Sequence, residues 1–130
     1  MPPIPAGEVT VALCPLPVSP DDVRLRHKTS DRRFYTDARI ASGEFEVAFV
    51  HPSGAITEGS FTNIFVPGED GRLRTPPLPL GLLPGVLRGQ LIEEGRAYEA
   101  EVREADLVEG FFIGNALRGL IPARLARAAP

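Results

Sequence analysis

Prolines and glycines are spread along this chain, and their spacing constrains the fold more than any other feature of the sequence. The 130 residues include 14 prolines and 13 glycines, which separate short apolar stretches instead of gathering in one segment. Proline removes a backbone N–H group and glycine permits backbone conformations that other residues avoid, so both residues favour turns. The sequence therefore predicts a folded chain of short secondary-structure elements joined by many turns.

The apolar stretches between the turns predict strands with interspersed helices. Residues 45–50 and 61–66 are expected to form a hairpin-like pair, because both are apolar and the turn Pro52-Ser53-Gly54 separates them. A helix is expected at residues 32–41, with Asp31 as its N-cap and Gly43 just past its end. We also expect strands at residues 8–13, 72–75, 97–103, 111–114 and 120–125, a helix that begins at Pro84-Gly85 and ends before Gly95, and a short helix at residues 105–108. This mixture is typical of an α+β domain.

The size and charge of the chain narrow the kinds of partner that it can bind. A chain of 130 residues is long enough for one domain with a real core. The formal net charge of −3 provides no large positive field for nucleic acid or an anionic membrane, so we expect a small-molecule or protein partner. Cys14 is the only cysteine, which excludes an internal disulfide. Because no apolar run approaches membrane-spanning length and no leader is recognised, a cytoplasmic location is expected.

Lys28 is the only lysine, against 13 arginines, so any chemistry that needs a lysine amine depends on this residue. Arg26, Arg32 and Arg33 flank it. Neighbouring positive charge favours the neutral amine, which can attack an aldehyde cofactor. A coding bias toward arginine, with one lysine left by chance in a solvated basic cluster, explains the same observation. The cluster alone leaves both interpretations open.

Three segments further along the chain could complete a cofactor site. Glu58 lies in a run of small polar residues, where a carboxylate could keep a pyridine nitrogen protonated. The backbone N–H groups of the helix that follows Pro84-Gly85 could bind a phosphate, and Asn115 could add one more donor. Each segment also has an ordinary structural explanation, as a glutamate in a turn, a helix start and a turn between strands.

Other chemistries have less support in the sequence. His27 and His51 are the only histidines, and they lack the spacing of metal ligands. His27 is therefore interpreted as a packing or hydrogen-bonding neighbour and His51 as a loop residue. No nucleophile elbow, Walker motif or dinucleotide fingerprint is present, and no metal site is expected.

Four motifs, taken in order, carry a resemblance to a known family. They are His27-Lys28-Thr29, Thr57-Glu58-Gly59 with Asn63, Leu83-Pro84-Gly85-Val86-Leu87-Arg88 and Gly114-Asn115-Ala116-Leu117. Over roughly residues 25–125, this order resembles the class IV (fold-type IV) pyridoxal-phosphate (PLP) enzymes. Within that superfamily, residues 27–32, 75–78 and 114–120 look most like 4-amino-4-deoxychorismate lyases, in particular the lyase part fused behind aminodeoxychorismate synthase. D-amino-acid and branched-chain aminotransferases are the neighbouring possibilities.

The resemblance implies roles for three side chains. Lys28 would be the catalytic residue, which forms a Schiff base with PLP and later moves protons. Glu58 would pair with the pyridine nitrogen of the cofactor. Arg32 fits the lyase version of the lysine motif and would be a further cofactor-binding residue.

The resemblance also implies a phosphate site. The backbone N–H groups of Val86 and Leu87 would hold the phosphate, and Asn115 stands where the family has a further phosphate contact. Aminotransferases often have a threonine at the position of Leu87, whose hydroxyl adds a bond, whereas leucine offers only its backbone.

The expected fold is α+β and resembles the large C-terminal domain of the D-amino-acid aminotransferase-like PLP fold, a barrel-like mixed sheet with a few helices. Enzymes of this family have a smaller N-terminal domain that closes over the substrate. We therefore expect residues 1–22 to be a remnant strand and interdomain linker, and residues 23–130 to be the PLP-binding domain of a truncated or once-fused protein. A homodimer is implied, and an aminodeoxychorismate synthase component is a further possible partner.

Three functions are consistent with these observations. The first is a PLP-dependent lyase that converts 4-amino-4-deoxychorismate into 4-aminobenzoate and pyruvate in the folate pathway. The second is a class IV aminotransferase that acts on branched-chain or D-amino acids. The third is a non-catalytic remnant that only associates with a partner.

Overall fold

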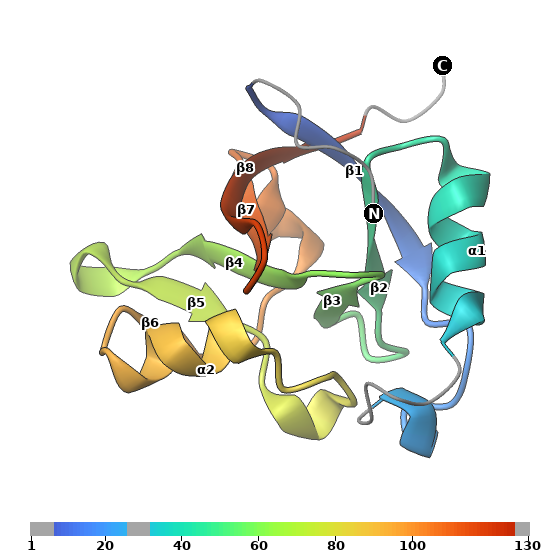
Figure 1. Cartoon of the computed structure of the whole chain (residues 1–130), viewed down its shortest axis with the longest axis horizontal. Coiled ribbons are helices and arrows are strands. Elements are labelled where there is room, and N and C mark those ends of the chain that lie inside the picture. The colour runs from blue at the N-terminus through green and yellow to red at the C-terminus, as the bar shows by residue number, and fades with distance from the viewer. Residues whose placement is uncertain (1–6, 26–31, 127–130) are drawn as a thin grey trace.

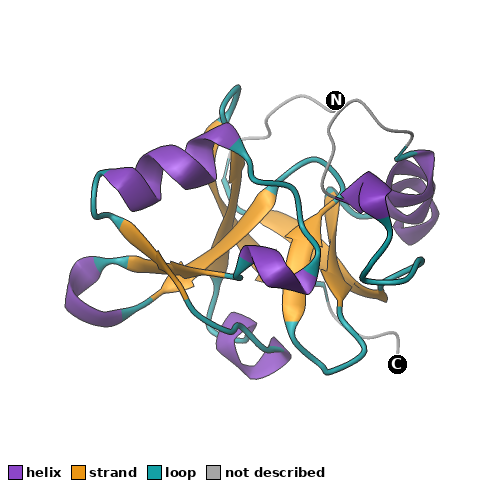
Figure 2. Cartoon of the chain, turned by 90° about the horizontal axis from the view of Figure 1, so that it is seen from below, coloured by secondary structure: helices purple, strands orange, loops and turns teal. Residues whose placement is uncertain are grey.

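A mixed sheet of eight short strands forms the body of the molecule, and the helices lie around its outside (Figures 1 and 2). The computed structural model describes residues 7–25 and 32–126. The strands are β1 (Val9–Pro15), β2 (Glu46–Val50), β3 (Ile56–Gly59), β4 (Asn63–Pro67), β5 (Leu73–Thr75), β6 (Ala97–Glu99), β7 (Phe111–Asn115) and β8 (Gly119–Leu125). The α-helices are α1 (Arg33–Ser42) and α2 (Val86–Glu93), and the 3-10 helices are η1 (Val23–Leu25), η2 (Glu69–Gly71), η3 (Leu78–Leu80) and η4 (Glu104–Leu107).

The sheet closes on itself over six of its strands. The strand order is β3-β2-β1-β8-β7-β4-β5-β6, and an additional pairing between β3 and β4 joins the two sides of a ring. The pairs β1–β2, β1–β8 and β5–β6 are parallel, whereas the other pairs are antiparallel. The predicted α+β class with a barrel-like mixed sheet is confirmed.

Three apolar clusters hold the layers together. The largest fills the ring and includes Val11, Ala48, Ile64 and Ile113, all fully buried. A second cluster lies between α1 and the outer face of β2, and a third lies under α2. Because β2 contributes to the first two clusters with alternate residues, both of its faces are buried, which explains its nearly continuous apolar sequence.

Helix α1 confirms the predicted helix but begins differently. Its N-cap position is occupied by Arg32 and not by the predicted Asp31, which lies outside the described residues. No side chain caps the helix, since Arg32 offers no side-chain oxygen for this purpose. Gly43 ends the helix with a left-handed φ of 72°, as predicted. Tyr35 is the fully buried residue of the helix, and Phe34 packs only partly against the same cluster.

The predicted hairpin is wrong in its second arm. Strand β2 pairs with β3, at Ala48↔Gly59 and Val50↔Ile56, and not with residues 61–66. Those residues belong largely to β4, which pairs with β3 and β7. Two strands therefore replace the one that was predicted, because a tight turn at residues 60–62 reverses the chain. Glu58 lies in a strand as a result, and not in a turn.

Smaller differences concern the second half of the chain. The strand predicted at residues 97–103 is confined to β6, and the short helix predicted at residues 105–108 is the 3-10 helix η4. Helix α2, Gly95 after it and the strands β5, β7 and β8 lie close to their predicted positions.

Strand β1 bears on the predicted division of the chain after residue 22. It lies inside the sheet and is parallel to both β2 and β8. The division therefore follows a strand that shares hydrogen bonds with the rest of the sheet, and it stays a prediction. Within the described residues, no helix is long and apolar enough to cross a membrane.

Candidate cofactor site

Lys28, His27 and Asp31 lie outside the described residues, so the role of Lys28 stays a prediction. The described chain stops before this segment at Leu25, which is fully buried, and resumes at Arg32. Arg32 is therefore the described residue of the lysine motif.

Glu58 is the best-defined member of the predicted site. It lies on β3 with only 2% of its surface exposed. Arg32 Nη2 donates to Glu58 Oε2 at 2.9 Å, and the backbone N–H of Leu83 donates to both carboxyl oxygens at 3.2 and 3.3 Å. Burial raises the pKa of Glu58 to about 8, although the Arg32 guanidinium and the Leu83 N–H oppose this shift. The carboxyl group can therefore hold or release a proton near neutral pH.

Asn63 connects Glu58 with the segment that precedes α2. It lies opposite Glu58 in the β3–β4 pair, and its Nδ2 donates to Leu83 O at 3.4 Å. A Cβ atom at Gly85 would collide with Asn63 Oδ1, so glycine is needed there for this close approach. The amide of Asn63 thus holds residues 83–85 against the strand that carries the buried carboxyl group. The sequence placed Asn63 in a motif but assigned it no contact.

The start of α2 offers free backbone donors. The N-cap Gly85 is extended and no side chain caps the helix. The N–H groups of the first turn of an α-helix, here those of Val86 and Leu87, have no partner within the helix. Together with the helix dipole they favour an anion. Val86 is 71% exposed, so these donors lie near solvent.

Asn115 is the last residue of β7 and is held by the protein. Its Nδ2 donates to Phe61 O at 3.0 Å, and its Oδ1 accepts the N–H of Arg118 at 2.9 Å. Strand β7 approaches α2 closely, since a Cβ atom at Gly114 would lie 2.9 Å from Leu87 Cδ2. Gly114, the neighbour of Asn115, thus lies against the first turn of α2, and the phosphate contact of Asn115 stays a prediction.

Arg88 braces the loop that precedes α2, a role that the sequence did not indicate. Its side chain is 5% exposed, and its Nη2 contacts Glu99 Oε2 at 2.5 Å and Pro76 O at 3.0 Å. The hydrogen bond from Arg88 lowers the pKa of the Glu99 carboxyl group. The hydrogen bond to Pro76 O ties the long proline-rich loop to α2, and the ion pair with Glu99 ties α2 to β6.

Neighbouring strands and the segment before α2 connect the five predicted residues on the described chain, which are Arg32, Glu58, Val86, Leu87 and Asn115. Glu58 pairs with Asn63 on β4, and Asn63 pairs with Gly114 on β7, next to Asn115. Leu83 connects the same carboxyl group to the start of α2. The arrangement joins a buried proton-holding group with an uncapped helix N-terminus.

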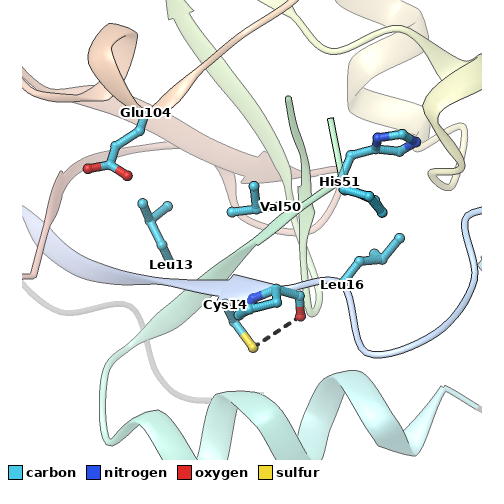
Figure 3. A pocket seen from close by; sticks show the side chains of 8 residues that line it. Leu13, Cys14, Leu16, Val50, His51 and Glu104 are labelled. Carbon is cyan, nitrogen blue, oxygen red and sulfur yellow. Dashed lines mark hydrogen bonds between the residues drawn. The ribbon is translucent and has the colours of Figure 1, made fainter. Parts of the chain in front are cut away.

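A separate shallow pocket lies at the ends of β1 and β2 and contains none of these residues (Figure 3). Leu13, Leu16 and Val50 make it largely apolar. Cys14 Sγ donates to Pro15 O at 3.4 Å, and burial raises the pKa of its thiol. His51 lies in the loop after β2, as predicted, with its Nδ1 2.9 Å from Ser53 Oγ.

The ring-shaped mixed sheet with helices on its outside is the fold of fold-type IV aminotransferases. The family model for amino-transferase class IV matches residues 1–126, and the chain belongs to this family.

Individual relatives agree with this assignment. The chain is 32% identical over 100 residues to the "Probable branched-chain-amino-acid aminotransferase" of Thermotoga maritima, over 68% of this chain and 36% of the relative. A crystal structure of a "Putative amino-acid aminotransferase" from Mesorhizobium loti is 44% identical, with a TM-score of 0.84, over 93% of this chain and 61% of the other.

A "Putative 4-amino-4-deoxychorismate lyase" from Legionella pneumophila shares the fold at 20% identity, with a TM-score of 0.78, over 96% of this chain and 50% of the other. Other solved relatives carry bound PLP. This chain thus spans between about a third and three-fifths of the length of the relatives described.

Proposed function

We propose that this chain binds PLP and that Lys28 is the residue that joins it covalently. The observation that carries the proposal is the position of Glu58, a buried carboxyl group connected through Leu83 to the uncapped start of α2. A group with a basic ring nitrogen and a phosphate suits such a pair of features. Bound PLP would supply an aldehyde and an electron-withdrawing ring.

Each of the predicted site residues would then have its own role toward bound PLP. Glu58 holds or yields a proton at a carboxyl oxygen, because burial keeps its pKa near 8. The N–H groups of Val86 and Leu87 orient and neutralise the phosphate, and Asn115 is the proposed further phosphate contact. Lys28 is the proposed proton carrier at the reacting carbon.

The reaction that we propose is that of a 4-amino-4-deoxychorismate lyase, which releases 4-aminobenzoate and pyruvate. One support is the set of residues in the motifs around Lys28, Thr75 and Asn115. The other is a solved relative whose description names this activity. A homodimer and an aminodeoxychorismate synthase component are the proposed partners.

A class IV aminotransferase is the second candidate, and a specific observation favours it. The relatives with higher identity, at 32% and 44%, are described as aminotransferases. Substrate specificity depends on side chains that contact the substrate, and the chain covers only part of these relatives, so identity over the cofactor domain does not decide between the two reactions.

Absorbance of the purified chain with added PLP tests the binding proposal. We expect a spectral change with the wild type that is absent with Lys28→Ala, and that survives removal of free PLP by gel filtration. Equal spectra for the two proteins would contradict both enzymatic functions. If the change depends on Lys28, release of pyruvate indicates the lyase, and amino-group transfer to a keto acid indicates the aminotransferase.

A further inference from the structure

We infer that Arg32 is a positioning residue for Glu58, which fixes the carboxyl group and sets how readily it ionises, and that it does not bind the cofactor itself. The inference deepens the proposed function, since it concerns the group assigned to the pyridine nitrogen. It rests on the contacts of Arg32, on the packing behind it and on the charges around Glu58.

The first observation is the ion pair between the two side chains. Arg32 Nη2 lies 2.9 Å from Glu58 Oε2, and the side chains are 15% and 3% exposed, respectively. A hydrogen bond from a charged donor is stronger than one between neutral groups, and exclusion of water strengthens it further. A guanidinium that already contacts the carboxyl group acts on the cofactor through that group.

The second observation is the aromatic support behind the guanidinium. Arg32 Cζ lies 4.8 Å from the centre of the Tyr35 ring, and Tyr35 stacks on Phe49 with ring centres 3.8 Å apart. Tyr35 and Phe49 are both fully buried. The planar guanidinium is therefore held between a rigid aromatic pair and the carboxyl group, a geometry that suits arginine better than lysine.

The third observation is the set of groups that face Glu58. Burial raises its pKa, Arg32 lowers it through charge and a hydrogen bond, the Leu83 N–H lowers it, and the Glu46 charge raises it. Tyr35 bears a hydroxyl whose pKa is itself raised by burial, so it stays neutral at ordinary pH. Arg32 is the cationic side chain in contact with Glu58 within the described part of the chain.

The two carboxyl oxygens have different surroundings. Oε2 faces Arg32, whereas Oε1 accepts, among the described residues, only the Leu83 N–H at 3.2 Å. Arg32 Nε is buried and has no hydrogen-bond partner among the residues that the structure describes, and Arg32 contacts Glu58 through Nη2. This division leaves Oε1 as the oxygen for a pyridine nitrogen.

The test is a titration of the ligand-free chain of 130 residues. The side-chain carboxyl carbon of Glu58 is followed by ¹³C NMR between pH 4 and 12 and assigned with Glu58→Gln. For Arg32→Gln we expect the midpoint to rise by about 1–3 pH units, the usual effect of losing a close opposite charge. For Arg32→Lys, which keeps the charge, we expect a rise of less than about one unit.

Two variants serve as controls. Arg24 pairs with Asp22 at 2.8 Å and lies 4.7 Å from the centre of the Phe34 ring, so Arg24→Gln removes a similar arrangement away from Glu58. Tyr35→Phe keeps the ring that supports Arg32 and removes only the hydroxyl. Both should leave the Glu58 midpoint unchanged. Amide spectra identify variants that unfold, and Arg32→Met then replaces Arg32→Gln because its side chain still packs on Tyr35.

An unchanged midpoint in Arg32→Gln, or an equal shift in Arg24→Gln, would overturn the inference. A shift in Arg32→Lys as large as that in Arg32→Gln would overturn the assigned role of charge. Because the titration needs no PLP, it is independent of the proposed function. If no variant binds PLP but the midpoints move as expected, the proposed function fails and the role of Arg32 stands.

Discussion

Two buried glutamates on neighbouring strands of the same sheet have opposite surroundings. Glu46 on β2 is fully buried and accepts hydrogen bonds from Ser60 N at 2.9 Å, Ser60 Oγ at 2.6 Å, Phe61 N at 3.1 Å and Thr62 Oγ1 at 2.9 Å. Glu58 on β3 is 2% exposed but has one arginine and one backbone N–H as partners. Equal burial therefore does not mean an equal role.

The difference separates a carboxyl group with a structural role from the one that we propose to contact a cofactor. The donors to Glu46 come from the tight turn at residues 60–62, so this carboxylate takes the place of missing backbone acceptors and fixes the path from β3 to β4. Glu58 lies in β3 before this turn, and Asn63 lies in β4 after it. Glu46 therefore supports the strands of the proposed site, whereas Glu58 is the carboxyl group that we propose to contact the cofactor.

Removal of the Glu46 side chain should have the largest effect on stability. In Glu46→Ala, the backbone N–H groups of Ser60 and Phe61 lose their acceptor, and each buried unpaired group costs about 1–3 kcal/mol. We expect a loss of about 3–5 kcal/mol in the free energy of unfolding, measured with urea. Glu93→Ala, on the exposed side of α2, is the control and should change little. A loss below about 1 kcal/mol for Glu46→Ala would contradict the structural role.

The second-largest effect on stability should come from a substitution of Gly59, which follows Glu58 in the chain and contacts Glu46. A Cβ atom at Gly59 would lie 2.5 Å from Glu46 Oε2 and 2.6 Å from Thr62 Oγ1. Overpacking of this kind costs about 1–3 kcal/mol, so Gly59→Ala should lower the melting temperature. Gly89→Ala is the matched control, because it lies in α2 with open space around it and should gain up to about 1 kcal/mol. Equal melting temperatures would argue against close contact at Gly59.

The pH dependence of stability should follow Glu58. Its pKa is raised from 4.5 to about 8 on folding, so the unfolded chain releases this proton first as the pH rises. The contribution to stability is complete below about pH 4.5 and is lost as the pH approaches 8, with a slope of at most about 1.4 kcal/mol per pH unit. Urea unfolding at pH 6 and pH 8 should show a decrease of about 2 kcal/mol. Glu58→Gln should remove this part of the slope, and a persistent slope would assign it to another group.

The smallest effect on stability should be that of Glu58→Gln at pH 5. The carboxyl group is then largely protonated, so the amide replaces a group of similar shape and charge, and we expect a change below about 1 kcal/mol. PLP retention after gel filtration should nevertheless fall, because glutamine cannot exchange a proton with the pyridine nitrogen. Normal PLP retention in this variant would remove Glu58 from the proposed cofactor site.

Local patterns predicted much of the fold and part of the site. Gly43 and Gly95 end their helices where expected, since left-handed glycine acts on its own neighbours. The sequence did not single out Tyr35, because only the position of β2 decides that its ring, and not that of Phe34, is fully buried. The prediction of a hairpin from residues 45–50 and 61–66 was wrong because the turn at residues 60–62 depends on Glu46, which lies 14 positions before Ser60.

The sequence by itself determined the glycines that follow both α-helices, the approximate positions of most strands and the class IV family to which the chain belongs. Tertiary structure alone decided that Glu46 supports a turn, that Arg32 faces Glu58 and that β3 joins β4 to close the sheet. The physical reason is distance along the chain. Turns and caps depend on neighbouring residues, whereas the surroundings of a buried charge are set by side chains as far as 26 positions away.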